Sequence, residues 1–339
     1  MKPRNLFAAF TESYVARRSD RFNRILAAFS ILLAALFLYL AVRNLDWRVF
    51  LVTLQNVNYI YLPAVFVWSS LSFLVRAFRL RVPLGSQKSL PLSNVFWANM
   101  SGYLGNSILP ARAGEIVRAT YLARKNDLSL SFALAVGLVE RLMDLAGLIV
   151  LGSFALSSVE LLSPIIQNAL KGVTLLGLIG LGATFTLPRF EAPVGRLIMT
   201  FPWIGEALKI RVSQLFSQFL GGLRALHNIK RLTLFLALTA LIMLMDAVGA
   251  VILADILQIP LLLPQAFVLN AALGISSAVP STPGYVGVYQ FVAVTVLAPF
   301  GISRADALVY ILISQILGYL NIGFWGVLSL LQYNRQVPT

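Results

Sequence analysis

The sequence predicts an all-α polytopic membrane protein, with about six transmembrane helices and two re-entrant broken-helix hairpins in an inverted repeat. Three observations support this fold class. Hydrophobic residues make up 58% of the 339 residues and charged residues only 12%, so several apolar stretches are long enough to cross a bilayer. Two breaks that contain proline and glycine interrupt apolar sequence. Lysines and arginines gather in alternate loops, as the positive-inside rule requires.

The predicted full spans lie at about 25–42, 59–78, 131–156, 170–188, 232–254 and 305–331. The first span follows a basic segment, residues 1–24, and no small-residue cleavage site precedes Arg43. We therefore interpret it as an uncleaved helix and not as a signal peptide. Residues 25–331 then form one transmembrane domain, followed by a short tail, residues 332–339.

Two segments, residues 92–123 and 265–300, are predicted to be re-entrant hairpins. Each contains a polar small-residue step, two aliphatic residues, and then proline and glycine four positions apart. Proline removes a backbone donor and glycine admits conformations outside the regular helix. Such a break survives in a membrane only inside protein or beside water. The break residues are Pro110, Gly114, Pro280, Pro283, Gly284 and Gly287.

The distribution of basic residues predicts the topology. With these spans both termini are cytoplasmic, and the outer side holds only Arg43, Arg48, Lys171 and Arg304. This is the asymmetry that the positive-inside rule describes. The second hairpin is more ambiguous, because residues 285–300 are apolar and nearly long enough to span. Residues 196–228 show apolar positions at helical spacing among lysines and arginines. They predict a cytoplasmic amphipathic helix, which either contacts anionic lipid or connects spans beneath the bundle.

Two repeat units are predicted, at about 59–156 and 232–331, because sequence around both breaks is similar. The first hairpin enters from the inside and the second from the outside, so the units have opposite orientation, as in many carriers. Their chemistry differs. Aligning the breaks places Glu115, Arg118, Glu140, Arg141 and Asp144 opposite Tyr285, Val288, Ser314, Gln315 and Gly318.

The candidate substrate-binding residues are charged side chains within apolar sequence. Glu140, Arg141 and Asp144 lie inside the third predicted span, and Arg112, Glu115 and Arg118 lie on the first hairpin. Each unpaired charge in a span costs roughly 2.5–3.5 kcal/mol, so these six must face protein or water. On a helix, Arg141 can bridge toward Asp144. The six form either an ion-pair network that pins the hairpin or a site in which Arg112 and Arg118 receive an anionic headgroup.

Asp246 stands apart from these residues, in the fifth predicted span with no basic residue near it in sequence. It is a candidate for proton coupling. The alternative is a protonated carboxyl group that forms a hydrogen bond between helices.

Several classes of function are disfavoured. The formal charge of +14 resides in loops between apolar spans, which indicates membrane topology and not nucleic-acid binding. The chain has no cysteine and one histidine, His227, so a Cys/His metal site cannot form. No cofactor is expected. The sequence has no Ser-His-Asp, metal-ligand or phosphate-loop constellation, so we do not expect an enzyme.

The charged motifs and the Pro/Gly motifs, in their order, resemble the transmembrane flippase region of lysylphosphatidylglycerol synthases. These motifs are Leu109-Pro110-Ala111-Arg112-Ala113-Gly114-Glu115 with Arg118, Glu140-Arg141 with Asp144, and Pro283-Gly284-Tyr285-Val286-Gly287-Val288-Tyr289. The resemblance implies a stand-alone, flippase-like protein of a prokaryotic plasma membrane that moves a lipid between leaflets. Many members have an acid where this chain has Gln290, so no ionic role is implied there. We expect no synthase activity, because this sequence does not contain the soluble synthase domain.

The sequence thus predicts a translocase for an anionic phospholipid or a polyprenyl-linked lipid. Two alternatives stay open: a non-transporting scaffold for a membrane glycosyltransferase or envelope enzyme, and a carrier of a small soluble anion. The expected partner is membrane lipid, with a glycosyltransferase or a second copy of the chain as further candidates. The sequence does not define the lipid, the direction of transport or the coupling ion.

Overall fold

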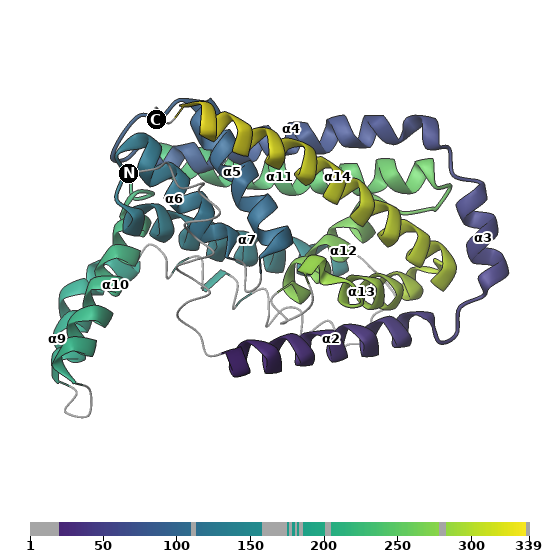
Figure 1. Cartoon of the computed structure of the whole chain (residues 1–339), viewed down its shortest axis with the longest axis horizontal. Coiled ribbons are helices and arrows are strands. Elements are labelled where there is room, and N and C mark those ends of the chain that lie inside the picture. Colours follow the sequence, from purple (N-terminus) through teal and green to yellow (C-terminus); the bar gives the residue numbers. More distant parts are fainter. Residues whose placement is uncertain are drawn as a thin grey trace.

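The computed structural model describes residues 20–109, 113–157, 186–200, 205–277 and 283–336, together with positions 175, 178, 179 and 182. Within these residues every regular element is a helix, which confirms the all-helical prediction. The long helices lie side by side in a bundle, and α9 (Glu191–Thr200) and α10 (Glu206–Arg224) project from one end of it (Figure 1).

The bundle contains two sets of four helices. Ahead of them run α2 (Asp20–Val42) and α3 (Trp47–Gln55). The first helix set consists of α4 (Leu62–Leu84), α5 (Leu92–Ile108), α6 (Gly114–Asn126) and α7 (Leu130–Ser157). The second helix set consists of α11 (Ile229–Ile256), α12 (Leu263–Ser276), α13 (Val288–Leu297) and α14 (Arg304–Gln336).

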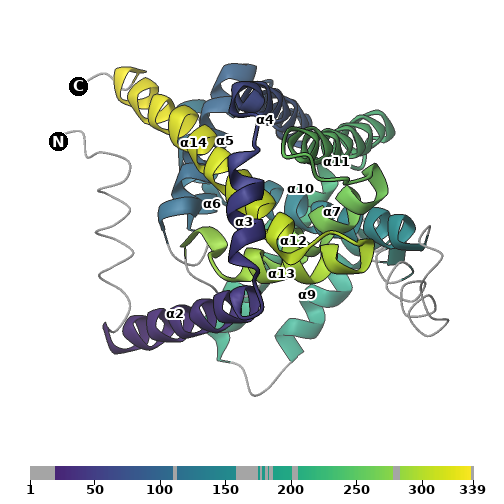
Figure 2. The ribbon, with the colours of Figure 1, turned by 90° about the vertical axis from the view of Figure 1, so that its right-hand side faces the viewer.

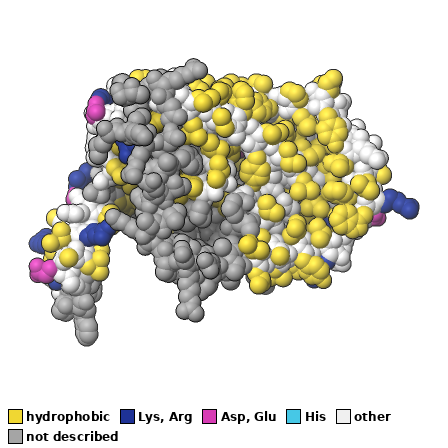
Figure 3. Space-filling view, viewed as in Figure 1, with side chains coloured by type: hydrophobic (Ala, Val, Ile, Leu, Met, Phe, Trp, Pro, Cys, Tyr) yellow, Lys and Arg dark blue, Asp and Glu magenta, His cyan; other side chains and the backbone are white. Residues whose placement is uncertain are grey.

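The chain has the helices of a membrane protein. Among the described residues, three stretches are long and apolar enough to cross a bilayer: Tyr59–Leu84, Ile229–Ile256 and Arg304–Tyr333. Hydrophobic side chains cover a broad band of the face in Figure 3, whereas lysine and arginine gather toward its two ends. A continuous apolar surface of this size marks contact with lipid or protein. The predicted span at 170–188 lies largely outside the described residues.

The second predicted span, 59–78, ends before the helix that the structure shows there. The expected limit was residue 78, but α4 continues to Leu84. Leu80 and Leu84 are buried against the neighbouring helices, so burial of this last turn extends the helix past two arginines. The structure therefore places Arg79 inside the protein, although the predicted topology put it in a cytoplasmic loop.

Residues 196–228 form two helices where the sequence predicted one. The structure places α9 and α10 here, with Gly205 as the N-cap of α10. Leu220 and Leu223, in the C-terminal half of α10, are buried in an apolar cluster with Val139 and Met143 of α7. That half therefore belongs to the bundle, while the rest of the pair projects from it (Figure 1).

The opposite end of the bundle is closed by α3, which crosses it between α2 and α4 (Figure 2). Asp46 caps this helix, because its carboxylate accepts hydrogen bonds from the backbone of Arg48 (2.9 Å) and Val49 (3.1 Å). An N-cap of this type satisfies backbone donors that the first turn leaves free. The sequence analysis did not predict this helix.

The two helix sets pack against each other in a reciprocal way. The first helices, α4 and α11, run antiparallel: Trp68 near the start of α4 donates to the Met245 carbonyl (2.7 Å), and Arg231 near the start of α11 donates to the Gly85 carbonyl just past the end of α4 (3.3 Å). Each broken hairpin packs against the last helix of the other set, with α5 on α14 and α12 on α7. The antiparallel first helices give the two helix sets opposite directions along the bundle.

At the first break, close packing explains the glycine. Pro110 lies outside the described residues, and Leu109 is extended (φ −90°, ψ 143°). Helix α6 begins at Gly114, and a Cβ there would overlap the backbone of Gly102 and Asn106 on α5. Gly114 therefore lets the two arms of the hairpin approach closely.

At the second break, backbone conformation explains the glycines. Pro280 lies outside the described residues, and Pro283 opens a single 3-10 turn, Pro283–Tyr285. Gly284 (φ 82°) and Gly287 (φ 86°) both occupy the left-handed region, which residues with a side chain rarely adopt. These two conformations, which a regular helix excludes, lead into the start of α13.

Candidate functional site: an ion-pair chain beside a cavity

An arginine that is not among the predicted site residues links the two acids of α7. Arg79 of α4 is 1% exposed, and its Nη2 lies 2.7 Å from Glu140 Oε1. It also donates to both carboxylate oxygens of Asp144. Glu140 and Asp144 lie one turn apart on α7, so one planar guanidinium bridges two acids on the same helical face.

Arg118 extends the cluster to the hairpin. Its guanidinium lies 2.7 Å from Glu140 Oε2 and 2.7 Å from Glu115 Oε2. Gly137 of α7 leaves room for it, since a Cβ there would lie 2.7 Å from Arg118 Nη2. The carboxylate of Glu115 in turn accepts from Arg141, through Nε (3.0 Å) and Nη2 (2.5 Å).

These contacts form one alternating series, which we call the ion-pair chain. Its order is Arg141, Glu115, Arg118, Glu140, Arg79 and Asp144. Each inner member contacts two opposite charges, and the three arginines balance the three acids. Such pairing is what allows charges to be buried at low dielectric. The ion-pair chain joins α4, α6 and α7.

The structure changes one expectation about this cluster. Arg141 does not pair with Asp144, because Arg79 takes that carboxylate and Arg141 turns to Glu115. Arg112, which was predicted as a third arginine of the cluster, lies outside the described part of the chain. Among the described residues, the third arginine is Arg79. A helix pattern that continued past residue 78 was the signal that could have identified Arg79.

Burial divides the ion-pair chain into a closed middle and open ends. Arg79, Glu140 and Arg118 are at most 4% exposed. The terminal members are more accessible, with Arg141 37% and Asp144 19% exposed. A charged ligand could therefore reach the terminal members of the ion-pair chain while its middle members stay paired.

Asp246 has an ionic partner that its sequence context did not indicate. It pairs with Arg76 of α4 and accepts a hydrogen bond from Ser72 (3.0 Å). Asp246 is 35% exposed and Arg76 is 22% exposed. Arg76 lies one turn before Arg79 on α4, so this pair adjoins the ion-pair chain.

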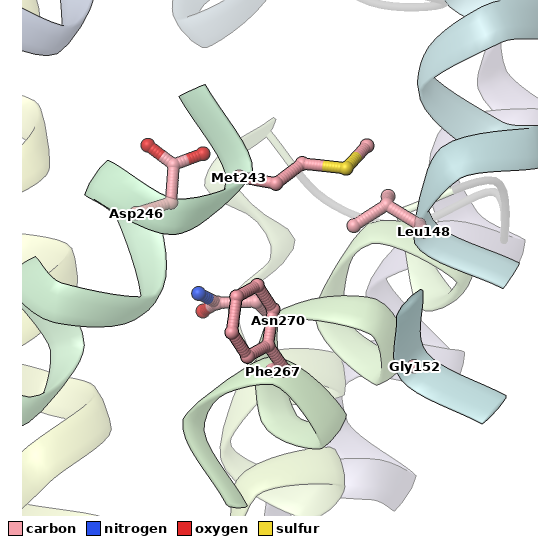
Figure 4. Close-up of a pocket in the computed structure, with 6 residues that line it drawn as sticks. All are labelled: Leu148, Gly152, Met243, Asp246, Phe267 and Asn270. Atoms are coloured by element: carbon pink, nitrogen blue, oxygen red, sulfur yellow. The ribbon is translucent and has the colours of Figure 1, made fainter. Parts of the chain in front are cut away.

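A cavity lies between the two helix sets. It encloses about 660 Å³, including its open mouth, and is lined by residues of α4, α11, α12 and α14. A smaller hollow of about 250 Å³ lies between α7, α11 and α12. Asp246 and Asn270 line both, so we refer to the two together as the central cavity. Figure 4 shows Asp246 on α11 across from Asn270 and Phe267 on α12, with Leu148 of α7 at the side.

The polar lining of the central cavity consists of Ser69, Ser72, Asp246, Asn270, Tyr310 and Ser314. The amide nitrogen of Asn270 is buried and has no hydrogen-bond partner among the described residues. A buried donor without a partner is costly, so a small rotation of this side chain, which lines the cavity, would bring the amide to a ligand atom or a water there.

The corresponding region of the second helix set is neutral. Gln315, aligned with Arg141, donates to the Gly284 carbonyl (2.9 Å), and Gln290 donates to Gln315 (2.5 Å). The backbone of Gly287 donates to Gln290 (2.7 Å). Amide side chains here satisfy the broken backbone. Within the described residues, no group of three or more His, Cys, Asp and Glu side chains could hold a metal ion.

Together, the apolar helices and the buried, balanced charges define a polytopic membrane protein. Over residues 27–326 the chain matches the family described as the lysylphosphatidylglycerol synthase TM region, and it belongs to this family. This confirms the resemblance that the charged and proline–glycine motifs indicated. Comparison with curated proteins and with solved structures gives no match.

Proposed function

We propose that this protein is a lipid translocase that carries a phosphate-bearing headgroup through a polar interior between the two helix sets. The ion-pair chain supports this proposal most directly, because it is buried in its middle and open at its ends, and because Arg76, one turn from its member Arg79, pairs with Asp246 in the wall of the central cavity. Membership of the family supports a role in lipid handling. In this proposal the protein performs no catalytic step.

Exposure assigns different roles to the arginines. Arg118 is buried between two carboxylates, so in our proposal it holds the hairpin instead of receiving the headgroup. Arg141 is more accessible and has one carboxylate partner, Glu115. A lipid phosphate can replace that carboxylate on the planar guanidinium, because both offer paired oxygens to the same donors. The acyl chains stay in the bilayer.

The reciprocal packing of the helix sets supports a mechanism of alternating access. We propose that the hairpins α5–α6 and α12–α13 are re-entrant and enter from the cytoplasmic and outer sides respectively. Rocking of one set against the other would then expose the central cavity to each leaflet in turn. In this proposal the protein lies in a prokaryotic plasma membrane and both termini face the cytoplasm, because the basic residues lie on that side.

The alternatives make different demands on the structure. A pure scaffold for a glycosyltransferase or envelope enzyme needs no cavity between the helix sets, whereas one is present. A carrier of a soluble anion would leave phospholipid in its own leaflet, so the leaflet-exchange assay below separates it from a translocase.

Leaflet exchange in reconstituted vesicles tests the proposal. Wild-type protein should accelerate the loss of a fluorescent phospholipid from the inner leaflet, measured with an impermeant quencher. Arg141→Gln should slow exchange about tenfold, as expected when one charge-assisted contact is lost. Arg304→Gln, an exposed change at the start of α14, serves as the matched control and should exchange like wild type. Wild-type vesicles that exchange no faster than protein-free vesicles would contradict the proposal.

A further inference from the structure

We propose that the central cavity selects a zwitterionic phospholipid headgroup, one that carries both a phosphate and a primary ammonium group. This inference rests on the proposed translocase function and narrows its substrate class. The phosphate binds Arg76 and the amide of Asn270, and the ammonium group binds Asp246. The observation that carries it is an accessible ion pair at the wall of a cavity that also contains an unpaired buried donor.

The ion pair between Arg76 and Asp246 is open to exchange. Both side chains retain exposure, in contrast to the nearly closed pair of Arg79 and Glu140. Asp246 and Ser72 line the cavity, and Arg76 lies one turn along α4 from Ser72. A headgroup in the cavity can therefore reach Asp246 directly and Arg76 just beyond it.

Charge balance decides which headgroup can enter. An anion that took Arg76 would leave Asp246 unpaired, and a cation that took Asp246 would leave Arg76 unpaired. Either outcome leaves an uncompensated charge in a poorly solvated site, which is strongly unfavourable. A zwitterion replaces both partners at once and leaves every charge paired.

The remaining lining fits such a headgroup. Asn270 presents a buried amide nitrogen without a partner, which is a suitable donor for a phosphate oxygen. Trp68 and Tyr310 line the same cavity as Asp246, and an ammonium group is attracted to aromatic faces. The hydroxyl groups of Ser69 and Ser314 can accept further ammonium hydrogens.

Equilibrium binding to the purified protein in detergent tests the selection. Phosphatidylethanolamine, phosphatidylglycerol and a phosphate-free cationic lipid with the same acyl chains are compared by native mass spectrometry. We expect phosphatidylethanolamine to bind at least about tenfold more tightly than either of the others. Equal or tighter binding of phosphatidylglycerol or of the cationic lipid would overturn the assignment. Glycerophosphoethanolamine, which has the same headgroup but no acyl chains, distinguishes a lipid from a soluble ligand. If it bound as tightly as phosphatidylethanolamine, the assignment of the ligand as a lipid would be overturned.

Substitutions separate the two charges. Asp246→Asn leaves Arg76 without its acid and should reverse the preference toward phosphatidylglycerol. Asn270→Ala should weaken binding of both phospholipids about tenfold and leave their order unchanged. Asp255→Asn, the same change as Asp246→Asn at an exposed position of α11, should bind like wild type. An unaltered preference in folded Asp246→Asn protein, or unaltered binding in Asn270→Ala, would overturn the placement. If Asp246→Asn fails to fold, the wild-type comparison and Asn270→Ala still decide.

Leaflet exchange separates this inference from the proposed function. Faster wild-type exchange of phosphatidylethanolamine than of phosphatidylglycerol is the expected result. Faster exchange of phosphatidylglycerol would overturn the headgroup assignment and leave the translocase standing. Absence of exchange for every lipid would overturn the translocase itself, and with it the inference.

Discussion

At the scale of single residues, Arg79 shows that a basic residue predicted to lie in a cytoplasmic loop can instead be buried in the protein. In the sequence it sits among other basic residues next to a predicted loop, and basic loops are normally cytoplasmic. In the structure it is almost fully buried and holds two acids of α7. The acids themselves were identifiable, because Glu140 and Asp144 lie inside apolar sequence. Their partner comes from residues 61 and 65 positions away, and nothing local in a sequence reports such a distant pairing.

Replacing Arg79 should therefore destabilise the protein strongly. Arg79→Met leaves Asp144 without its ionic partner and Glu140 with only Arg118, which should lower the free energy of unfolding by about 3–5 kcal/mol. Thermal unfolding in detergent measures the change. Arg81→Met on the same helix, where Arg81 has no ion pair among the described residues, should change stability by less than about 1 kcal/mol. Equal effects of the two substitutions would contradict a central role for Arg79.

At the scale of elements, the sequence predicted both helix breaks, but not how each one works. Proline and glycine within apolar sequence are sufficient to locate a break. Whether glycine is needed for space or for backbone conformation depends on what packs against it. Gly114 provides space beside Gly102, whereas Gly284 and Gly287 adopt positive φ, and Gly287 in addition provides space beside the backbone of Ala34. The division of residues 196–228 into two helices was missed, although Pro202 and Gly205 lie at the junction and are the sequence signal of a break.

Gln290 shows what replaces an ionic group at the second break. It accepts from the Gly287 backbone and donates to Gln315, and it is 1% exposed. Gln290→Leu removes both contacts and leaves buried polar groups unpaired, which should cost about 1–3 kcal/mol in unfolding free energy. Thermal unfolding again provides the measurement. Gln55→Leu, at the exposed end of α3, is the control and should have little effect. If Gln290→Leu is as stable as that control, Gln290 does not stabilise the second break through its contacts with Gly287 and Gln315.

At the scale of the whole molecule, the two helix sets pack reciprocally, and their first helices are antiparallel. Sequence similarity around the breaks predicted the two units, since proline and glycine positions repeat. It could not predict the cavity between them, because the lining comes from four helices of both sets. The asymmetry of charge was visible in the sequence, and the structure shows its result: ionic pairing in one set and amide pairing in the other.

If the two hairpins enter the membrane from opposite sides, cysteines placed in them should be labelled from opposite sides. The chain has no cysteine, so single cysteines report without background. Ser107 and Ser276 lie in the last turns of α5 and α12, and the hydroxyl of each donates to its own helix backbone. In oriented vesicles, an impermeant maleimide should label Ser107→Cys from the cytoplasmic side and Ser276→Cys from the outer side. Labelling of both positions from one side would contradict the inverted arrangement.

The central claim is that lipid moves because one helix set rocks against the other, and a reversible cross-link tests it most directly. A Cβ added at Gly152 of α7 would lie 2.6 Å from the Cβ of Ala271 on α12, close enough for a disulfide after a small adjustment. The measurement is leaflet exchange by the Gly152→Cys, Ala271→Cys double variant, before and after reduction. We predict no exchange when the variant is oxidised and recovery when it is reduced, whereas equal exchange in the fully cross-linked and reduced states would contradict the account.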